Sequence, residues 1–210
     1  KIKTYLSKQE YPAEIIVVDD GSTDGTVRIC EQFASVKVLK LGINQGKGAA
    51  VRNGMLRASG DRILFTDADL STPIEELNRF LLFSEDVIIG SRAMQGSKVT
   101  VHQPFYREFS GRFFNVLVQA LTVRNINDTQ CGFKLFSLSA ARKIFAKQRI
   151  DTFGFDVESM YLAKKYGYTV REVPVAWHND PETKVKIIRD SMTMFTDLLR
   201  IRWNDLRGKY

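Results

Sequence analysis

Short runs of β-branched and aliphatic residues alternate along the chain with longer segments in which apolar residues recur at helical spacing. Each short run is bounded by Gly, Asp or Ser, which is typical of buried parallel strands. Because strand-like and helix-like segments alternate, the pattern predicts an α/β fold. Strands are expected at residues 14–19, 36–41, 62–66, 86–90, 133–137 and 169–176.

Helices are expected between these strands. Pro73 stands at a position that suits the first turn of a helix, and Glu75 and Glu76 follow where negative charge complements the helix dipole. The order of elements becomes looser after Ser91. The remaining helices are expected after the turn at residues 21–26 and at residues 47–58, 105–121, 139–147 and 156–166.

The last segment, residues 184–203, combines apolar residues at helical spacing with lysines and arginines. This pattern predicts an amphipathic basic helix. Such a helix either packs on the core with its charges in solvent or lies on a membrane surface, and the pattern leaves both alternatives open. The apolar stripe is expected to contain Ile188, Met192, Phe195, Leu198 and Leu199.

Composition narrows the class of protein. The 210 residues, 44% hydrophobic and 26% charged, suit one globular domain and fit neither a disordered chain nor a bundle of membrane helices. The net charge of +7 is compatible with an anionic partner, but no nucleic-acid-binding motif accompanies it. Cys30 and Cys131 form no CxxC pair, which argues against a zinc site or a disulfide framework and favours a reducing, cytosol-facing environment. No apolar run has the length of about eighteen residues that a spanning helix needs, so membrane contact is expected to be peripheral.

Two acidic motifs follow predicted strands. Asp19 and Asp20 open the run DDGSTDGT, and Asp67 and Asp69 lie in ILFTDADLSTP. Ligands of α/β sheets bind at the carboxyl ends of the strands, where a carboxylate can contact a base or a ribose. In an extended backbone residues two apart point to the same side, so the second pair could face one Mg²⁺ or Mn²⁺ ion together. The alternatives are a capped turn for the first motif and a solvated loop for the second.

Between the two acidic motifs lies NQGKGAAVRNG, residues 44–54, with Lys47 between two glycines at a predicted helix start. Free backbone N–H groups, the helix dipole and an ammonium group could favour an anion there. The motif is not a Walker loop, because GxxxxGK[ST] is absent. The alternative is a surface lysine beside a tight turn.

The ordered set of VVDDGSTDGT, NQGKGAA, DADLSTP, IIGSR and DTQCGFKLF resembles the family 2 glycosyltransferases, in particular the branch that acts on dolichyl and other polyprenyl phosphates. The resemblance covers nearly the whole chain. It implies a GT-A fold with a mixed, mainly parallel sheet flanked by helices, an inverting mechanism, a nucleoside-diphosphate sugar donor and a divalent metal, Mg²⁺ or Mn²⁺. It also implies one domain, with a donor half at residues 1–92 and an acceptor half at residues 93–210.

Roles on the donor side follow from the resemblance alone. Asp20, with Asp19 beside it, matches the carboxylate that reads the nucleotide base. Asp67 matches the contact to ribose or sugar, and Asp69 matches the metal ligand, with Asp67 as its partner. Donor-binding roles are also assigned to Lys47 and to Lys184, the latter matching a basic position of the branch that is expected to reach the diphosphate.

Roles on the acceptor side follow in the same way. Arg92, with Arg107 and Arg112 in YREFSGR, matches the basic residues that hold the acceptor phosphate, for which a guanidinium fork is well suited. Gln130 and Lys134 are further acceptor contacts. The implied catalytic set is Asp69, Arg92 and Asp128. Because a phosphate monoester is already nucleophilic at neutral pH, Asp128 is expected to position a substrate rather than to act as an essential base.

The chain departs from the family at its start. Relatives open with a strand of the type VVIPAYNE, whereas residues 1–10 look like the helix that follows it. The sheet is therefore expected to lack an interior strand, and the sequence is expected to be a fragment.

The best hypothesis is transfer of glucose from UDP-glucose to dolichyl or another polyprenyl phosphate at the cytoplasmic face of a membrane. One alternative is a mannosyltransferase that uses GDP-mannose. Another is a non-catalytic module that binds nucleotide or lipid through the same fold.

Overall fold

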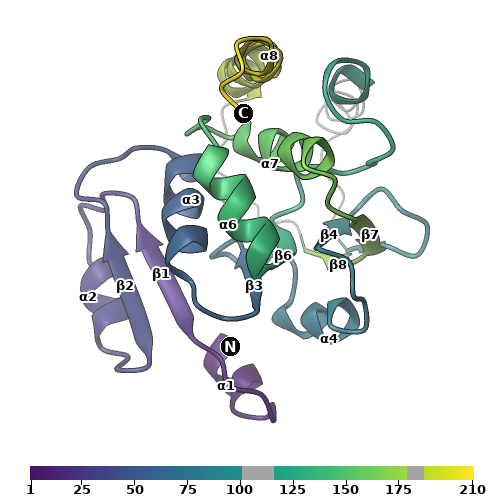
Figure 1. Cartoon of the computed structure of the whole chain (residues 1–210). Coiled ribbons are helices and arrows are strands. Elements are labelled where there is room, and N and C mark those ends of the chain that lie inside the picture. The colour runs from purple at the N-terminus through teal and green to yellow at the C-terminus, as the bar shows by residue number, and fades with distance from the viewer. Residues whose placement is uncertain (101–115, 179–186) are drawn as a thin grey trace.

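The computed structural model describes residues 1–100, 116–178 and 187–210 (Figure 1). Strands occur at all six predicted places, but the run at 169–176 is divided at Val175 into two strands. The strands are β1 (Ile15–Asp19), β2 (Val36–Lys40), β3 (Arg62–Thr66), β4 (Val87–Ser91), β5 (Lys98–Val99), β6 (Phe133–Ser137), β7 (Val170–Pro174) and β8 (Ala176–Trp177).

The central sheet has the order β3-β6-β4-β7. Strand β6 runs antiparallel to both of its neighbours, and β4 is parallel to β7. The pairs β1-β2 and β5-β8 are also parallel, so the arrangement is mixed, as expected. Within the described residues no ladder joins β1 to β3.

Most helices also lie where the periodicity predicts them. Exceptions are the segment after Pro73, which forms a 3₁₀ turn and one short helix, and residues 1–10, of which only five are helical. Of the helix expected at 105–121, residues 116–121 are helical and residues 105–115 lie outside the described part. The helices are α1 (Ile2–Leu6), α2 (Thr26–Glu31), α3 (Lys47–Arg57), η1 (Ile74–Glu76), α4 (Leu77–Phe80), α6 (Leu138–Lys147), α7 (Phe155–Lys165) and α8 (Ile187–Leu206).

Helices cover both faces of the central sheet, with α3, α6 and α7 on one side and α4 on the other (Figure 1). The alternation along β6 explains this arrangement. Phe133 packs edge-on against Phe80 of α4, and Phe136 packs edge-on against Phe145 of α6. Lys134 therefore points into the larger core, which has consequences for the site.

Glu14, the residue before β1, connects the start of this strand to neighbouring segments by hydrogen bonds and an ion pair. Glu14 accepts hydrogen bonds from the backbone N–H and the hydroxyl of Ser59, at 2.6 and 2.7 Å, and pairs with the ammonium of Lys37 at 2.7 Å. The Lys37 and Ser59 contacts lower the pKa of Glu14 to about 2. Because the pKa of Glu14 is lower in the folded state than in the unfolded chain, its carboxylate stabilises the fold at pH values above the unfolded-state pKa. This stabilisation is lost as the pH falls through the folded-state pKa.

We therefore expect Glu14→Gln to lower the free energy of unfolding by about 1 kcal/mol at neutral pH, since the site is partly solvated. The difference from the parent should shrink as the pH falls from 4.5 toward about 2. Urea unfolding of both proteins at neutral pH and near the acid end of this window measures it. A difference that is constant with pH would contradict the role of the charge.

Candidate functional site

The loop after β1 is built by its own carboxylates. Asp20 accepts hydrogen bonds from the backbone N–H groups of Gln45 and Gly46, at 2.7 and 2.8 Å, and Asp19 accepts one from Ser22 at 3.2 Å. Both oxygens of Asp20 thus hold the loop before α3 against the end of β1. The predicted contact of Asp19 and Asp20 with a nucleotide base stays a prediction, and in this structure Asp20 holds the loop before α3 in place.

Three backbone donors around the start of α3 are already used within the protein, which the sequence prediction of an anion site did not anticipate. The N–H of Gly48 donates to the Asp151 carbonyl at 2.7 Å, and the N–H of Ala49 points to the same oxygen at 3.4 Å. The N–H of Gly46 is taken by Asp20. A carbonyl from the loop before α7 therefore occupies two of the backbone donors that a phosphate could otherwise use at this helix start.

Lys47 is the first residue of α3 and places its ammonium group at this helix start. It lies 2.7 Å from Asp67 Oδ1 and within 6 Å of the ring centroids of Phe65 and Phe153. Burial acts to lower the pKa of Lys47, but the negative charges of Asp156 and Asp67 outweigh it, so the pKa is raised. The ammonium of Lys47 is therefore a partly buried cation held next to carboxylates. This position is compatible with the predicted contact to the sugar donor.

Asp67 and Asp69 follow β3 in a turn rather than in extended backbone. The Asp67 carbonyl accepts the N–H of Leu70 at 3.1 Å, and Leu70 has a left-handed φ of 53°. The sequence argument that the two carboxylates share a side because of strand alternation therefore does not apply. Asp69 is exposed and accepts the N–H of Ser71 at 2.8 Å, whereas Asp67 is half-buried against Lys47.

Gly132 provides the space that the Asp67 carboxylate occupies. The backbone N–H of Asp67 donates to the Gly132 carbonyl at 3.0 Å, and a Cβ at Gly132 would lie 1.9 Å from Asp67 Oδ2. Any larger residue at position 132 would displace the carboxylate. This contact between Asp67 and Gly132, called the Asp67 cradle below, joins the DAD motif to the DTQCGFK motif, although the two motifs lie far apart in the sequence.

The turn at Asp67–Leu70 suits a divalent cation whose remaining ligands come from substrate phosphates. Asp69 is exposed and one of its oxygens is not used by Ser71, while Asp67 shares Oδ1 with Lys47. Within residues 1–100, 116–178 and 187–210, no group of three or more His, Cys, Asp or Glu side chains could hold a metal alone. Mg²⁺ is commonly held by one or two carboxylates together with substrate phosphates, so Asp69, with Asp67, fits an ion of that kind.

The sequence prediction for Lys134 needs correction. This side chain is 1% exposed, and its ammonium donates to the Cys131 carbonyl at 2.7 Å and pairs with the Asp156 carboxylate. It is enclosed and does not reach an acceptor. Burial raises the pKa of Asp156, and the charges of Lys134 and Lys47 oppose that rise. The Lys134 ammonium lies 5.6 Å from the ring centroid of Phe65, and the negative charge of Asp156 acts on the ammonium of Lys47.

Arg92 and Asp128 form a two-pronged ion pair. Nε and Nη2 of Arg92 lie 2.7 and 2.9 Å from the two carboxylate oxygens, and the Arg92 backbone N–H donates to the same group at 3.0 Å. The guanidinium also lies 5.4 Å from the ring centroid of Trp177. Burial alone would raise the pKa of Asp128, but Arg92 lowers it. A carboxyl group held as its anion in this way is a poor base, which agrees with a positioning role.

The other predicted acceptor residues are less defined. The Gln130 side-chain amide contacts the sulfur of Met194 in α8 at 3.7 Å, so its role toward an acceptor stays a prediction. Arg107, Arg112 and Lys184 lie outside the described residues.

Sequence reasoning missed the support provided by the loop before α7. Asp197 of α8 is buried, accepts a hydrogen bond from Thr152 and leaves no room for a side chain at Gly154. Glu158 accepts the N–H of Ile150 at 2.9 Å from within the core. Asp197 looks in sequence like an ordinary helix residue, and only its contact with Thr152, more than forty residues away, distinguishes it.

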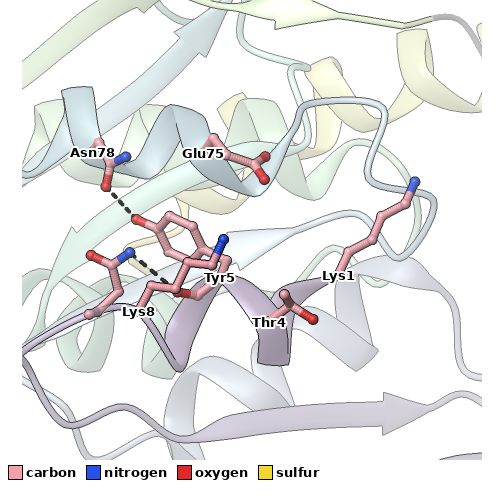
Figure 2. A pocket seen from close by; sticks show the side chains of 7 residues that line it. Lys1, Thr4, Tyr5, Lys8, Glu75 and Asn78 are labelled. Carbon is pink, nitrogen blue, oxygen red and sulfur yellow. Dashed lines mark hydrogen bonds between the residues drawn. The ribbon is translucent and has the colours of Figure 1, made fainter.

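A cavity of about 470 Å³ lies away from these residues, between α1 and η1-α4 (Figure 2). The hydroxyl of Tyr5 donates to Asn78 Oδ1 at 2.6 Å in its wall. It shares no lining residue with the acidic motifs, so it is separate from the candidate site. Its lining residues are Lys1, Thr4, Tyr5, Lys8, Gln9, Glu75 and Asn78.

Known proteins similar to this chain are glycosyltransferases. Residues 2–145 match the model of the family described as glycosyl transferase family 2. A dolichyl-phosphate beta-glucosyltransferase from Dictyostelium discoideum is 36% identical over 95% of this chain and 65% of its own length. One from Saccharomyces cerevisiae is 35% identical over 97% of this chain and 69% of its own length. The chain thus spans about two thirds of these relatives.

Solved structures share the fold at low identity. Mannosyl-3-phosphoglycerate synthase from Rubrobacter xylanophilus superposes with a TM-score of 0.70 at 18% identity, over 99% of this chain and 68% of the other. Glucosyl-3-phosphoglycerate synthase from Mycobacterium tuberculosis, solved with Mn²⁺, UDP and phosphoglyceric acid, gives 0.62 at 18% identity, over 90% and 67%. These similarities show a GT-A-like fold.

Proposed function

Because the chain belongs to the family 2 glycosyltransferases, we propose that it transfers a hexose from a nucleoside-diphosphate sugar to dolichyl or another polyprenyl phosphate. The observation that carries the proposal is the cluster at the end of β3. There Lys47 pairs with Asp67 at 2.7 Å beside the exposed carboxylate of Asp69. The names of the dolichyl-phosphate beta-glucosyltransferase relatives support glucose as the sugar, and UDP-glucose is the proposed donor.

The donor side combines fixed charges of both signs. Lys47 supplies a cation that Phe65 and Phe153 enclose, and its raised pKa keeps it charged at neutral pH. Asp69, with Asp67, would hold a divalent ion, and such an ion would supply charge stabilisation for the leaving diphosphate. The predicted contacts of Asp19, Asp20 and Lys184 with the donor belong to this part of the proposal.

The acceptor side needs a cation rather than a base. Arg92 keeps one terminal nitrogen, Nη1, outside its paired contacts with Asp128, so a phosphate oxygen can bind there. Asp128 fixes the plane of the guanidinium and remains an anion. The acceptor phosphate, mostly dianionic at neutral pH, then attacks the sugar without losing a proton to the protein. Arg107, Arg112 and Gln130 complete the proposed acceptor contacts at the cytoplasmic face of a membrane.

A transfer assay tests the proposal. Purified protein is incubated with dolichyl phosphate in detergent, with Mg²⁺ or Mn²⁺, and with UDP-glucose or GDP-mannose. We expect a glucosylated lipid with UDP-glucose and a loss of about a hundredfold or more in rate for Arg92→Met at fixed acceptor. Product with GDP-mannose alone would contradict the choice of sugar. Binding of a sugar nucleotide without any transfer would favour the non-catalytic alternative.

A further inference from the structure

The Arg92 guanidinium has two partners of different kinds. The Asp128 carboxylate binds two of its nitrogens, at 2.7 and 2.9 Å, and the ring centroid of Trp177 in β8 lies 5.4 Å from its central carbon. A cation within about 6 Å of an indole centroid is attracted by the electron-rich face of the ring. Trp177 is therefore a second partner of the residue that the proposed function places at the acceptor phosphate.

Backbone contacts fix the position of the strand that carries the indole. The carbonyl of Trp177 accepts the N–H of Thr100 at 3.2 Å. The N–H of the next residue, His178, donates to the carbonyl of Ser71 at 2.8 Å. Ser71 in turn donates its own N–H to the exposed carboxylate of Asp69 at 2.8 Å. Strand β8 is thus joined to the turn that carries the proposed metal ligand.

The carboxylate partner of Arg92 is also held in place by the backbone. Glu172 of β7 accepts the N–H of Asp128 at 3.0 Å and the N–H of Asn127 at 2.9 Å. Because Asp128 and Trp177 are both anchored, the guanidinium that contacts them has little freedom to turn.

The two partners act differently on a bound phosphate. Asp128 occupies Nε and Nη2 of Arg92 and carries a negative charge that opposes an anion. The indole is neutral and has no acceptor for an N–H of the guanidinium, so Nη1 stays outside the paired contacts. A ring at this place can orient the cation, whereas a second carboxylate would compete with the phosphate for the same donors.

We propose that Trp177 is a positioning residue for the acceptor phosphate. Its ring sets the direction in which the Arg92 guanidinium meets the phosphate, and β8 holds the ring in a fixed place relative to the turn that carries Asp69. This role rests on the proposed transfer to a polyprenyl phosphate. Because Trp177 acts through Arg92, its loss is expected to impair the use of the acceptor and to spare the use of the donor.

Steady-state transfer from UDP-glucose to citronellyl phosphate, a short isoprenyl phosphate that dissolves in water, separates the two substrates. Trp177→Leu is expected to raise KM for the isoprenyl phosphate about tenfold and to leave KM for UDP-glucose within about twofold of the parent. Trp177→Phe keeps a ring and should recover most of the difference. Trp203→Leu is the matched control, because Trp203 lies on α8 with the Arg207 guanidinium 4.5 Å from its ring centroid. An unchanged KM in Trp177→Leu, or an equal loss in Trp203→Leu, would overturn the proposal.

A binding titration tests the same role without transfer and with the indole in place. The chain has two tryptophans, so Trp203→Phe leaves Trp177 as the single one, and its emission reports on the surroundings of Arg92. Citronellyl phosphate should change this emission saturably, whereas citronellol, which lacks the phosphate, should not. Arg92→Lys in the same background should lose the saturable change, because lysine keeps the charge but has no planar fork.

The titration separates the positioning role from the proposed function. Emission that does not respond to citronellyl phosphate, or that responds equally to citronellol, would overturn the role of Trp177 even in a protein that transfers sugar. A saturable response in a protein that transfers no sugar would contradict the proposed function and support the positioning role.

Discussion

Replacing Lys134 with methionine is expected to lower the free energy of unfolding by about 3–5 kcal/mol, because it leaves the Asp156 carboxylate buried without its cation. Lys134 and Asp156 have side-chain exposures of 1% and 5%, so water cannot replace the missing partner. The expected result does not mean that the pair is worth this amount, since ion pairs inside proteins lose much hydration when they form. Denaturant unfolding of the two proteins at neutral pH measures the difference.

The double substitution Lys134→Met with Asp156→Leu provides the decisive comparison. Replacing both charges by apolar groups is expected to recover most of the lost stability. Lys165→Met is the surface control, since Lys165 pairs with Asp205 at 33% exposure and its loss should cost about 1 kcal/mol or less. A single Lys134→Met variant as stable as this control would show that Asp156 is not an isolated buried charge.

Gly132→Ala is expected to reduce the rate of sugar transfer about a hundredfold. The added Cβ would lie 1.9 Å from Asp67 Oδ2, so the carboxylate must rotate away from it. Rotation breaks the contact of 2.7 Å between Asp67 and Lys47, and a displacement of about 1 Å at a catalytic site can cost this much activity. The unfolding free energy should fall by only about 1–3 kcal/mol, since the clash meets a side chain.

Gly60→Ala serves as the control for Gly132→Ala. Gly60 precedes the opposite end of β3, and a Cβ there would lie 3.3 Å from the Arg62 carbonyl oxygen, a mild contact. Full activity in Gly60→Ala together with lost activity in Gly132→Ala would assign the effect to the Asp67 cradle. Full activity in both would show that the position of the Asp67 carboxylate does not matter for transfer.

The local pattern of apolar and polar residues predicts most of the fold but little of the candidate site. Strands such as β3 and helices such as α6 are predictable within a residue, because their periodicity is set by local burial. The turn at Asp67–Leu70 is not, since a left-handed φ at a leucine has no sequence signal. The burial of Lys134 depends on Asp156, 22 residues away, which meets it only when α7 packs on the sheet.

Helix α8 shows the same limit in another form. Apolar spacing identifies the helix, but its two apolar faces merge in sequence, so Leu198, which is buried, and Leu199, which is about half exposed, look alike. Which face is covered depends on where α7 lies. Likewise, the donors at the start of α3 look free until the Asp151 carbonyl is placed over them.

The most direct test of the central claim is calorimetric titration of the protein with UDP-glucose, in the presence of Mn²⁺ and again with a chelator. The claim is that the carboxylates after β3, together with Lys47, bind a sugar nucleotide with a divalent cation. We predict that removing the metal weakens binding about tenfold or more and that Asp69→Ala abolishes this dependence. Binding that is equal with and without metal, or unchanged metal dependence in Asp69→Ala, would contradict the account.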